Sequence, residues 1–341
     1  MKWGGDVANI LDVAKASGYS KSTVSRVFVD PENVHPATRE KILKVAEALN
    51  YMPNAVARSM ITKRTENIGF IIYEKQAPVF SNPFYGPILQ SIVNGIEQKG
   101  YSLFLASDKE LRMPSGEIML RKQVDGVILA SQTDAETVQS FQRRGIPVVL
   151  LNYQLAMENV YCVLSNDYGG IKQAVEYFIK GGHKNIGLLS GQFTPFIFER
   201  RFQAFIDVMR SHDLTPDGRF IQTAELTIGA AYRQTANMFR QKEIPSALLC
   251  TNDIMAVGAI KAIHKAGLCV PDDIEVIGYD NSEYCQVCDP ELSSVDGGKD
   301  RLGDLAVKLL MKLIDGKPPA DKVLSVDARL VLRNSTRKHG K

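Results

Sequence analysis

Residues 20–27 of this chain are Ser20-Lys21-Ser22-Thr23-Val24-Ser25-Arg26-Val27, and they predict the second of two paired helices. Ser20 can cap this helix, because its hydroxyl can accept a backbone N–H of the first turn. A first helix is predicted from Ile10 to Ala16, and Gly18 supplies the break that a tight turn between helices requires. Three apolar residues recur at the spacing of one buried helix face: Val24, Val27 and Phe28.

The other face of this predicted helix carries short hydroxyl groups and two cations. Such side chains suit a DNA duplex, because arginine pairs with guanine O6 and N7, and hydroxyls reach bases or phosphate oxygens. The alternative is a solvated polar face on a small helical hairpin, since this helix pattern is common by chance. The residues expected to contact DNA here are Ser20, Lys21, Ser22, Thr23, Ser25 and Arg26.

Two further helices are predicted after this pair. Pro36 can open a third helix at its first position. Its predicted buried stripe is Ile42, Val45, Ala46 and Leu49. Pro53-Asn54 then begins a short helix of small residues, which can approach a narrow groove closely, and the apolar tip Met60 can wedge between base steps. A plain linker helix is the alternative. The candidate DNA contacts in this part are Tyr51, Asn54, Ala57 and Met60.

These segments resemble the amino-terminal signature of the LacI/GalR family of bacterial transcription regulators. The matching residues are Asp12-Val13-Ala14-Lys15, Ser20 to Val27, Thr38-Arg39-Glu40-Lys41 and Tyr51-x-Pro53-Asn54-x-x-Ala57-Arg58-Ser59. By this resemblance, Lys21, Ser22 and Arg26 fall on base-reading positions. Asn54 and Ala57 fall on hinge-helix positions, and Met60 stands where the family usually has an intercalating leucine. Val29-Asp30 departs from the family, which usually has asparagine there.

Charge and cysteine content narrow the class of protein. Residues 1–65 contain ten lysines and arginines against six acidic residues, whereas the remaining 276 residues contain 31 against 32. The net positive charge therefore lies in the predicted DNA-binding part. Five cysteines are an odd number in a large chain, and they favour reduced thiols over a disulfide framework. The two cysteines of the CxxC segment Cys285-Gln286-Val287-Cys288 are also expected to be reduced thiols. Without an apolar run of membrane length or a signal peptide, we expect a cytoplasmic protein with no membrane contact.

From residue 66 onwards, short apolar strands alternate with amphipathic helices, which predicts parallel sheets. The first series has strands at Asn67–Tyr73, Tyr101–Ser107, Gly126–Ala130 and Pro147–Leu151, with helices such as Phe84–Lys99 and Asp134–Arg144. The second has strands at Asn185–Ser190, Ile221–Ala224, Ala247–Thr251 and Glu275–Gly278, with helices near 168–180, 198–212, 229–241, 253–266 and 299–315.

The expected fold is an α/β core of two doubly wound, parallel-sheet lobes like those of periplasmic binding proteins, preceded by an all-α helix-turn-helix domain. The expected boundaries are 7–52 for the DNA-binding domain, 53–65 for a hinge helix and linker, and 66–341 for a core that binds an effector and dimerises. In such sheets ligands bind beyond the carboxyl ends of the strands, so facing lobes create one cleft that can close.

The strand ends supply the candidate effector contacts. Amide, carboxylate and guanidinium groups pair with adjacent hydroxyls in bidentate fashion, which is what a sugar presents, and aromatic rings can stack on a sugar face. Taken singly, each polar residue is also explained as a helix cap, as with Asn252 before a helix. The candidates are Phe84, Tyr85, Asn152, Phe196, Arg201, Asn252 and Asp280, with Phe193 as a further aromatic residue. By the family resemblance, Arg201, Asn252 and Asp280 match effector-contact positions, and Asn152 stands where many sugar-binding members have aspartate.

Other chemistries lack a pattern in the sequence. There is no GxxxxGK[ST] loop, no HExxH and no glycine triplet of a dinucleotide site, so no cofactor or metal is expected, and the protein is not expected to be an enzyme. The five histidines look scattered, without ligand spacing: His35, His183, His212, His264 and His339.

We therefore expect a sequence-specific regulator, a repressor of carbohydrate-utilisation genes, that binds a pseudo-palindromic operator in double-stranded DNA as a homodimer. A small molecule, a mono- or oligosaccharide, would control it allosterically. The alternative keeps the DNA-binding role but assigns control to a phosphorylated carrier protein or a purine-type ligand. A solute-binding protein for transport would have the same cleft, but it would leave the DNA-binding part unexplained.

Overall fold

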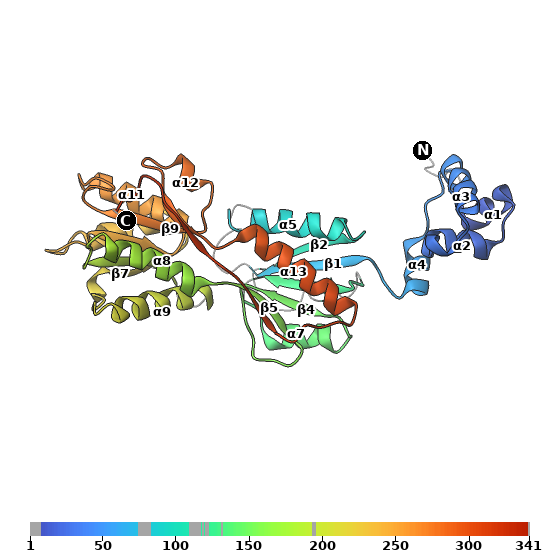
Figure 1. The fold of residues 1–341 in the computed structure, drawn as a ribbon, viewed down its shortest axis with the longest axis horizontal. Helices are drawn as coiled ribbons and strands as arrows, with labels where there is room; N and C mark the ends of the chain where they lie inside the picture. The colour runs from blue at the N-terminus through green and yellow to red at the C-terminus, as the bar shows by residue number, and fades with distance from the viewer. Residues whose placement is uncertain are drawn as a thin grey trace. The chain divides into compact units, whose positions relative to one another are not determined.

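The structure is a computed structural model, and it describes residues 8–73, 83–108, 117, 119, 123–130, 132–192 and 196–339. Its elements group into two compact units, Met1–Glu66 and Asn67–Lys341 (Figure 1). Among the described residues, no helix combines the length and the apolar character needed to cross a membrane. Each unit is described by itself below.

The first unit is a small helical domain. Its elements are α1 (Ile10–Ser17), α2 (Lys21–Val29), the 3-10 turn η1 (Pro31–Asn33), α3 (Pro36–Ala48) and α4 (Ala55–Thr62). Gly18 adopts φ 76°, the left-handed conformation that ends α1 and allows the turn into α2. The predicted helix-turn-helix is thus confirmed, and its core consists of Val13, Val24, Val27, Ile42 and Ala46.

One residue of the predicted stripe on α3 is misplaced. Leu49 is 37% exposed, because α3 ends at Ala48 and the chain turns away before Leu49 can reach the core. The aromatic ring of Tyr51 takes the place beside the core instead, edge-on to Phe28 with 5.6 Å between ring centroids.

The first lobe of the second unit is a six-stranded parallel sheet in the order β11-β5-β4-β3-β1-β2. Alternate residues of β1 face opposite sides, as a strand requires. Phe70 packs beneath α5 (Tyr85–Glu97) and α13 (Lys299–Ile314), whereas Ile71 packs on the side of α7 (Ala135–Gln142). The strands are β1 (Asn67–Tyr73), β2 (Ser102–Asp108), β3 (Gly126–Ala130), β4 (Val148–Leu151), β5 (Tyr161–Ser165) and β11 (Val323–Val326).

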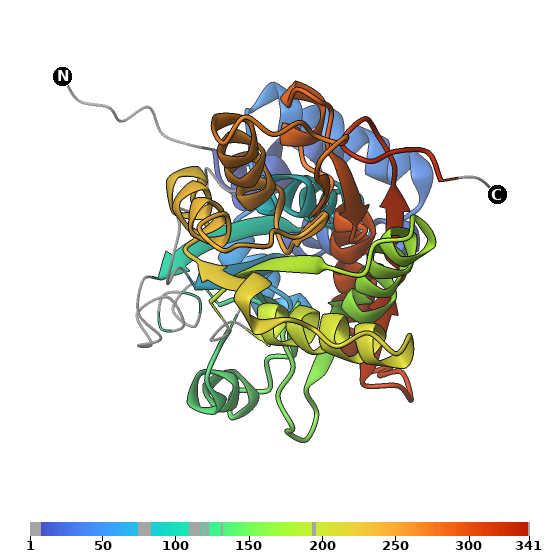
Figure 2. The same ribbon diagram turned by 90° about the vertical axis from the view of Figure 1, so that its left-hand side faces the viewer.

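The second lobe repeats this plan with the order β12-β10-β9-β8-β6-β7, in which only β12 is antiparallel to its neighbour. Helices cover both faces of the sheet (Figure 2): α8 and α9 on one, α10 and α11 on the other. The strands are β6 (Ile186–Gly191), β7 (Ile221–Ala224), β8 (Ala247–Cys250), β9 (Glu275–Tyr279), β10 (Ser293–Asp296) and β12 (Arg329–Val331). The helices are α8 (Asp167–Lys180), α9 (Phe196–Ser211), η3 (Gly218–Phe220), α10 (Ile228–Met238), α11 (Asp253–Lys265) and α12 (Tyr284–Val287).

The two-lobed fold is confirmed, but the assignment of helix 299–315 to the second series is wrong. That helix is α13, and its residues Leu302, Ala306 and Leu310 are buried in the core of the first lobe against α5. The chain therefore crosses between the lobes three times, after β5, β10 and β11.

Hydrogen bonds join the three crossings to one another. Ser165 donates through Oγ to the carbonyl of Gly297 at 3.2 Å, and the N–H of Asn166 donates to the carbonyl of Val326 at 2.9 Å. Because these bonds connect segments far apart in the sequence, the crossings form one short connection between the lobes.

Candidate functional site: a helix face for DNA and an ion-paired cluster in the core

The start of α2 presents its polar side chains to solvent. Ser20 caps the helix, since its Oγ accepts the N–H of Thr23 at 3.1 Å and lies 2.8 Å from the hydroxyls of both Ser22 and Thr23. Lys21, Ser22 and Arg26 are exposed, whereas Thr23 and Ser25 are partly buried. The exposed donors and cations thus lie on the side of α2 opposite to its buried residues.

The other predicted DNA contacts are distributed between α4 and the core of the first unit. Tyr51 is partly buried against Phe28, and burial raises the pKa of its phenol. The carbonyl of Asn54 accepts the N–H of Arg58 at 3.0 Å, which places Asn54 at the start of α4. Ala57 and Met60 belong to α4 by their backbone, but their side chains lie outside the described residues.

In the core, Arg201 on α9 is only 1% exposed, and acceptors enclose its guanidinium. Nε donates to Oδ1 of Asp167 at 3.0 Å, and Nη1 donates to the carbonyl of Thr251 at 2.7 Å. Nη2 lies 3.6 Å from Oδ1 of Asp280, and the guanidinium lies over the ring of Tyr279, 3.5 Å from its centroid. Burial acts to lower the pKa of Arg201, but the adjoining carboxylates raise it overall, so this cation stays charged.

Asn252 and Asp280 form the next layer of this cluster. The Oδ1 atom of Asn252 caps α11 by accepting the N–H of Ile254 at 2.9 Å, while its Nδ2 donates to Oδ2 of Asp280 at 2.5 Å. The cap and the cluster contact, which the sequence suggested as alternatives, therefore coexist. Burial raises the pKa of Asp280 to about 7, even though Arg201 acts to lower it. A proton on Asp280 is thus exchangeable near neutral pH.

Lys299, which the sequence did not single out, closes the cluster from the start of α13. The residue is 8% exposed, and its ammonium donates to the backbone carbonyls of Asp280 and Asn281. Both residues have positive φ, 100° and 47°, so the chain turns sharply after β9. Lys299 fixes this turn, because one cation binds two consecutive carbonyls.

The buried carboxylate of Asp253 lies beside this cluster and accepts hydrogen bonds from the segments around it. It accepts the N–H and the hydroxyl of Ser282 at 2.6 and 2.8 Å, and the hydroxyl of Ser294 at 2.6 Å. The thiol of Cys285 also donates to it at 3.3 Å, and all five cysteines are free. The CxxC segment therefore supplies one thiol to the packing around Asp253, and burial raises the pKa of that carboxyl.

Asn152 follows β4 in the first lobe and is 7% exposed. Its Oδ1 accepts the N–H of Ser165 at 3.1 Å, which ties the end of β4 to the end of β5. Its Nδ2 is buried and has no hydrogen-bond partner among the described residues. This amide therefore keeps a donor available, and the φ of 52° at Asn152 shows that the backbone turns out of the strand at the same residue.

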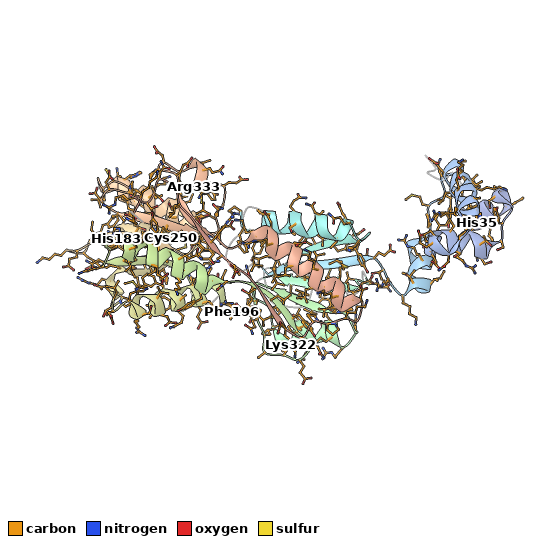
Figure 3. All side chains as sticks on the ribbon, in the orientation of Figure 1. His35, His183, Phe196, Cys250, Lys322 and Arg333 are labelled. Atoms are coloured by element: carbon orange, nitrogen blue, oxygen red, sulfur yellow. The ribbon has the colours of Figure 1, made fainter. Side chains whose placement is uncertain are left out.

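The predicted aromatic residues occupy different places. Phe84 is buried in the core of the first lobe and lies edge-on to Tyr85, with 5.2 Å between the ring centroids. Phe196, labelled in Figure 3, lies at the start of α9 in the second lobe and packs edge-on against Tyr153 of the first lobe at 5.6 Å. Phe193 lies outside the described residues.

The structure thus unites Arg201, Asn252 and Asp280 in one cluster, whereas Asn152, Phe84 and Tyr85 belong to the first lobe. Asp167 and Tyr279 also belong to this cluster, but the sequence did not identify them as site residues. The phenol of Tyr279 donates to Oδ1 of Asp167 at 3.0 Å. In the sequence, Asp167 looks like any acidic residue in the first turn of a helix, where such residues are common. Its contact with Arg201 is therefore visible only in the folded structure.

One expectation about histidines is wrong. His183 and His339 come together with Glu275, and the three ligand atoms lie within 4.8 Å of one another. Their sequence separation hid this group, because it forms only when the C-terminal tail packs beside β9.

Two family models match the chain. One describes bacterial regulatory proteins of the lacI family and matches residues 9–54, and the other describes a periplasmic binding protein-like domain and matches residues 175–336. The transcriptional repressor PurR of Histophilus somni (strain 129Pt) is 32% identical over 338 residues, covering 97% of this chain and 99% of its own. PurR of Actinobacillus pleuropneumoniae serotype 3 (strain JL03) is 31% identical over 337 residues, with coverages of 97% and 99%.

Solved structures give the same result. The Lac repressor dimer bound to operator and the anti-inducer ONPF superposes with a TM-score of 0.84 at 25% identity, covering 96% of this chain and 99% of that one. The complex of the regulator CelR with cellobiose has the same fold, with a TM-score of 0.74 at 24% identity and the same coverages. A helix-turn-helix unit joined to a two-lobed core of this kind defines a DNA-binding transcriptional repressor. The chain belongs to the lacI family of bacterial regulatory proteins.

Proposed function

We propose that this repressor binds a pseudo-palindromic operator as a homodimer and that a purine-type small molecule, bound between the lobes of the core, controls it. The exposed residues Lys21 and Ser22 in the first turn of α2, and Arg26 in its last turn, support base contacts in the major groove. In this proposal α4, to which Ala57 and Met60 belong, lies at the minor groove, and Asn54 at its start contacts DNA. The dimer is supported by the Lac repressor structure, which is a dimer on its operator.

The cluster around Arg201 carries the effector proposal. Asp280, with its pKa of about 7, can accept or donate a hydrogen bond, and the buried Nδ2 of Asn152 supplies a further donor. A purine presents ring nitrogens that accept and exocyclic groups that donate or accept, and its planar face can stack on an aromatic ring such as Tyr85 or Phe196. The name of the full-length relatives, PurR, favours this class.

A mono- or oligosaccharide is the second candidate. Amide and carboxylate groups such as those of Asn152, Asn252 and Asp280 also bind adjacent hydroxyls, and CelR, which shares the fold, is seen in complex with cellobiose. This candidate differs from the first in the groups that are recognised. A sugar offers adjacent hydroxyls and an apolar ring face, whereas a purine offers a flat aromatic ring with acceptors in its plane.

Control would act through the three crossings between the lobes. An effector that contacts Asn152 on one lobe and Asp280 on the other changes the relative free energy of two lobe settings only if it binds one of them better. In the proposal, this coupling free energy is transmitted to α4 and changes operator affinity.

The deciding experiment measures thermal unfolding of the full-length protein with purine bases, nucleosides, monosaccharides and oligosaccharides. A ligand at about 100 times its dissociation constant stabilises by roughly 2.7 kcal/mol, a shift of several degrees. We expect a shift with one or more purines and none with sugars. A shift with sugars alone supports the second candidate, and no shift with any compound favours a protein partner such as a phosphorylated carrier, or a small molecule outside these classes.

A further inference from the structure

The histidine and glutamate group lies at the amino edge of the second sheet, away from the effector cluster at its carboxyl edge. Glu275 is the first residue of β9 and is fully buried. His183 precedes β6 and is 6% exposed, and Figure 3 shows it in the second lobe, well apart from Phe196. His339 belongs to the C-terminal tail, and its side chain is 11% exposed. Neither the proposed DNA contacts nor the proposed effector contacts include these residues.

The tail is held in place by bonds that lead to this group. The N–H of Val276 donates to the carbonyl of Ser335 at 2.9 Å, and the hydroxyl of Ser335 donates to the carbonyl of Val276 at 2.6 Å. Tyr177 on α8 donates through its phenol to the carbonyl of Arg337 at 2.7 Å, and its ring lies 4.7 Å from that of His339. These hydrogen bonds fix the course of the C-terminal tail, and this places the imidazole of His339 beside Glu275.

The distances within the group are slightly shorter than those between two ligands of one small cation. Nε2 of His183 lies 3.1 Å from Oε1 of Glu275, and Nε2 of His339 lies 3.0 Å from Oε2. Two ligands at about 2.0–2.1 Å around a tetrahedral zinc ion are separated by roughly 3.3 Å. Two imidazoles and one carboxylate are also a common ligand set for zinc, with a fourth position left to water.

The surroundings of His183 give a second indication. Its Nδ1 lies 2.8 Å from the hydroxyl of Ser246, and that hydroxyl donates its proton to the carbonyl of Asn185 at 3.5 Å. When Nδ1 carries the ring proton and donates to Ser246, Nε2 keeps a lone pair. In that tautomer the buried Nε2 cannot donate to the carboxylate oxygen of Glu275 that it faces at 3.1 Å. A lone pair and a carboxylate at this distance repel each other unless a cation lies between them, whereas a proton on Nε2 would form a hydrogen bond to Glu275 instead.

We propose that His183, Glu275 and His339 bind a Zn²⁺ ion that fastens the C-terminal tail to the second lobe. The hydroxyl of Ser246 can accept the Nδ1 proton of His183, which leaves Nε2 available to a metal. Arg337 competes with the ion, because its Nε donates to Oε1 of Glu275 at 2.9 Å. Gly181 makes room for the third ligand, since a side-chain carbon there would overlap the ring of His339.

The test titrates Zn²⁺ into metal-free, full-length protein in competition with a chromogenic chelator. We expect one ion per chain, and at least a tenfold loss of affinity in His339→Ala. Gly181→Ala should also lose affinity, although it removes no ligand, whereas Gly218→Ala, where the space around the glycine is open, should not. Arg337→Ala should bind Zn²⁺ more tightly, because the competing cation is gone.

His212→Ala is the matched control, since Nε2 of His212 lies 3.3 Å from Oε1 of Glu176 on the exposed surface, and His212 is not part of the metal-ligand group found among the described residues. It should bind as the wild type does. Absence of stoichiometric binding to the wild type, or wild-type affinity in His339→Ala, overturns the proposal. So does a loss of binding in Cys269→Ser with none in His339→Ala, because an exposed thiol would then be the ligand. Thermal unfolding of each metal-free variant verifies that it is folded.

Discussion

Arg201 and Asp280 illustrate how a single residue in this core depends on its neighbours. From the sequence, Arg201 could be named as a candidate because it lies in the first part of a predicted helix after a strand, and Asp280 because it follows a strand. What could not be predicted is that Asp167 and Tyr279 complete the same cluster. Contacts between segments separated by dozens of residues depend on how the sheet is ordered, and the residue pattern does not encode that order locally.

Arg201→Ala should lower the free energy of unfolding by about 3–5 kcal/mol, because the buried carboxylates of Asp167 and Asp280 would lose their cation. Denaturant-induced unfolding measures this loss. The matched control is Arg219→Ala, which removes an arginine paired with Asp217 and Glu243 on the exposed surface, and which should leave the unfolding curve unchanged. Equal effects of the two substitutions would contradict the importance of burial.

Asp280 should make stability depend on pH near neutrality. Its pKa of about 7 in the folded protein lies above the ordinary value of 3.8, so the folded state binds the proton more tightly than the unfolded chain. The stabilisation is present at low pH and is lost as the pH rises through about 7, with a slope of at most about 1.4 kcal/mol per pH unit. Unfolding free energies measured from pH 6 to 8 should therefore decline less in Asp280→Asn than in the wild type. Parallel declines would rule out Asp280 as the titrating group.

At the scale of elements, the sequence predicted those that have their own periodicity or cap. Strands β3 and β7 lie where they were expected, and Ser20 and Pro36 begin the helices that they were expected to begin. Four strands were missed: β5, β10, β11 and β12. β11 and β12 lie at sheet edges, alternate little between apolar and polar residues, and are only four and three residues long. They form because neighbouring strands offer hydrogen bonds, which is tertiary information.

On α2, Arg26→Ala should weaken operator binding by about 1–3 kcal/mol, as expected for a side chain that pairs with guanine. A gel-shift or anisotropy titration against operator DNA measures the change. Lys44→Ala is the control, because Lys44 is an exposed cation of the same unit that pairs with Glu40 on α3. If both variants lost affinity equally, the contribution of Arg26 would be a general attraction between charges.

The pair α10 and α11 packs closely at Gly258. A side-chain carbon there would overlap the carbonyl of Ile228 and come within 2.7 Å of Cβ of Ala231. Gly258→Ala should therefore destabilise the second lobe by about 1–3 kcal/mol through overpacking. Gly229→Ala on α10, where the nearest atom is the end of a flexible arginine at 3.6 Å, should be neutral or stabilising by up to about 1 kcal/mol. Thermal unfolding of the two variants distinguishes these outcomes.

For the whole molecule, the division into Met1–Glu66 and Asn67–Lys341 predicts two unfolding events. Each unit has a hydrophobic core of its own, so each should unfold cooperatively. A fragment from Asn67 onward should show the same transition temperature, in calorimetry, as the corresponding transition of the full-length chain. A fragment that unfolds several degrees lower would demonstrate a stabilising contact with the first unit.

The late position of α13 and β11 in the chain has a consequence for biosynthesis. The first lobe begins at β1. Two of its elements, however, are translated only after most of the second lobe: α13, which covers the same sheet face as α5, and the edge strand β11. During synthesis, the sheet face that Leu302 and Leu310 later cover therefore remains open while β6 to β10 emerge from the ribosome. A ribosome that stalls near the second crossing displays a complete set of inner strands with an uncovered apolar face, which is the type of surface that chaperones and proteases recognise.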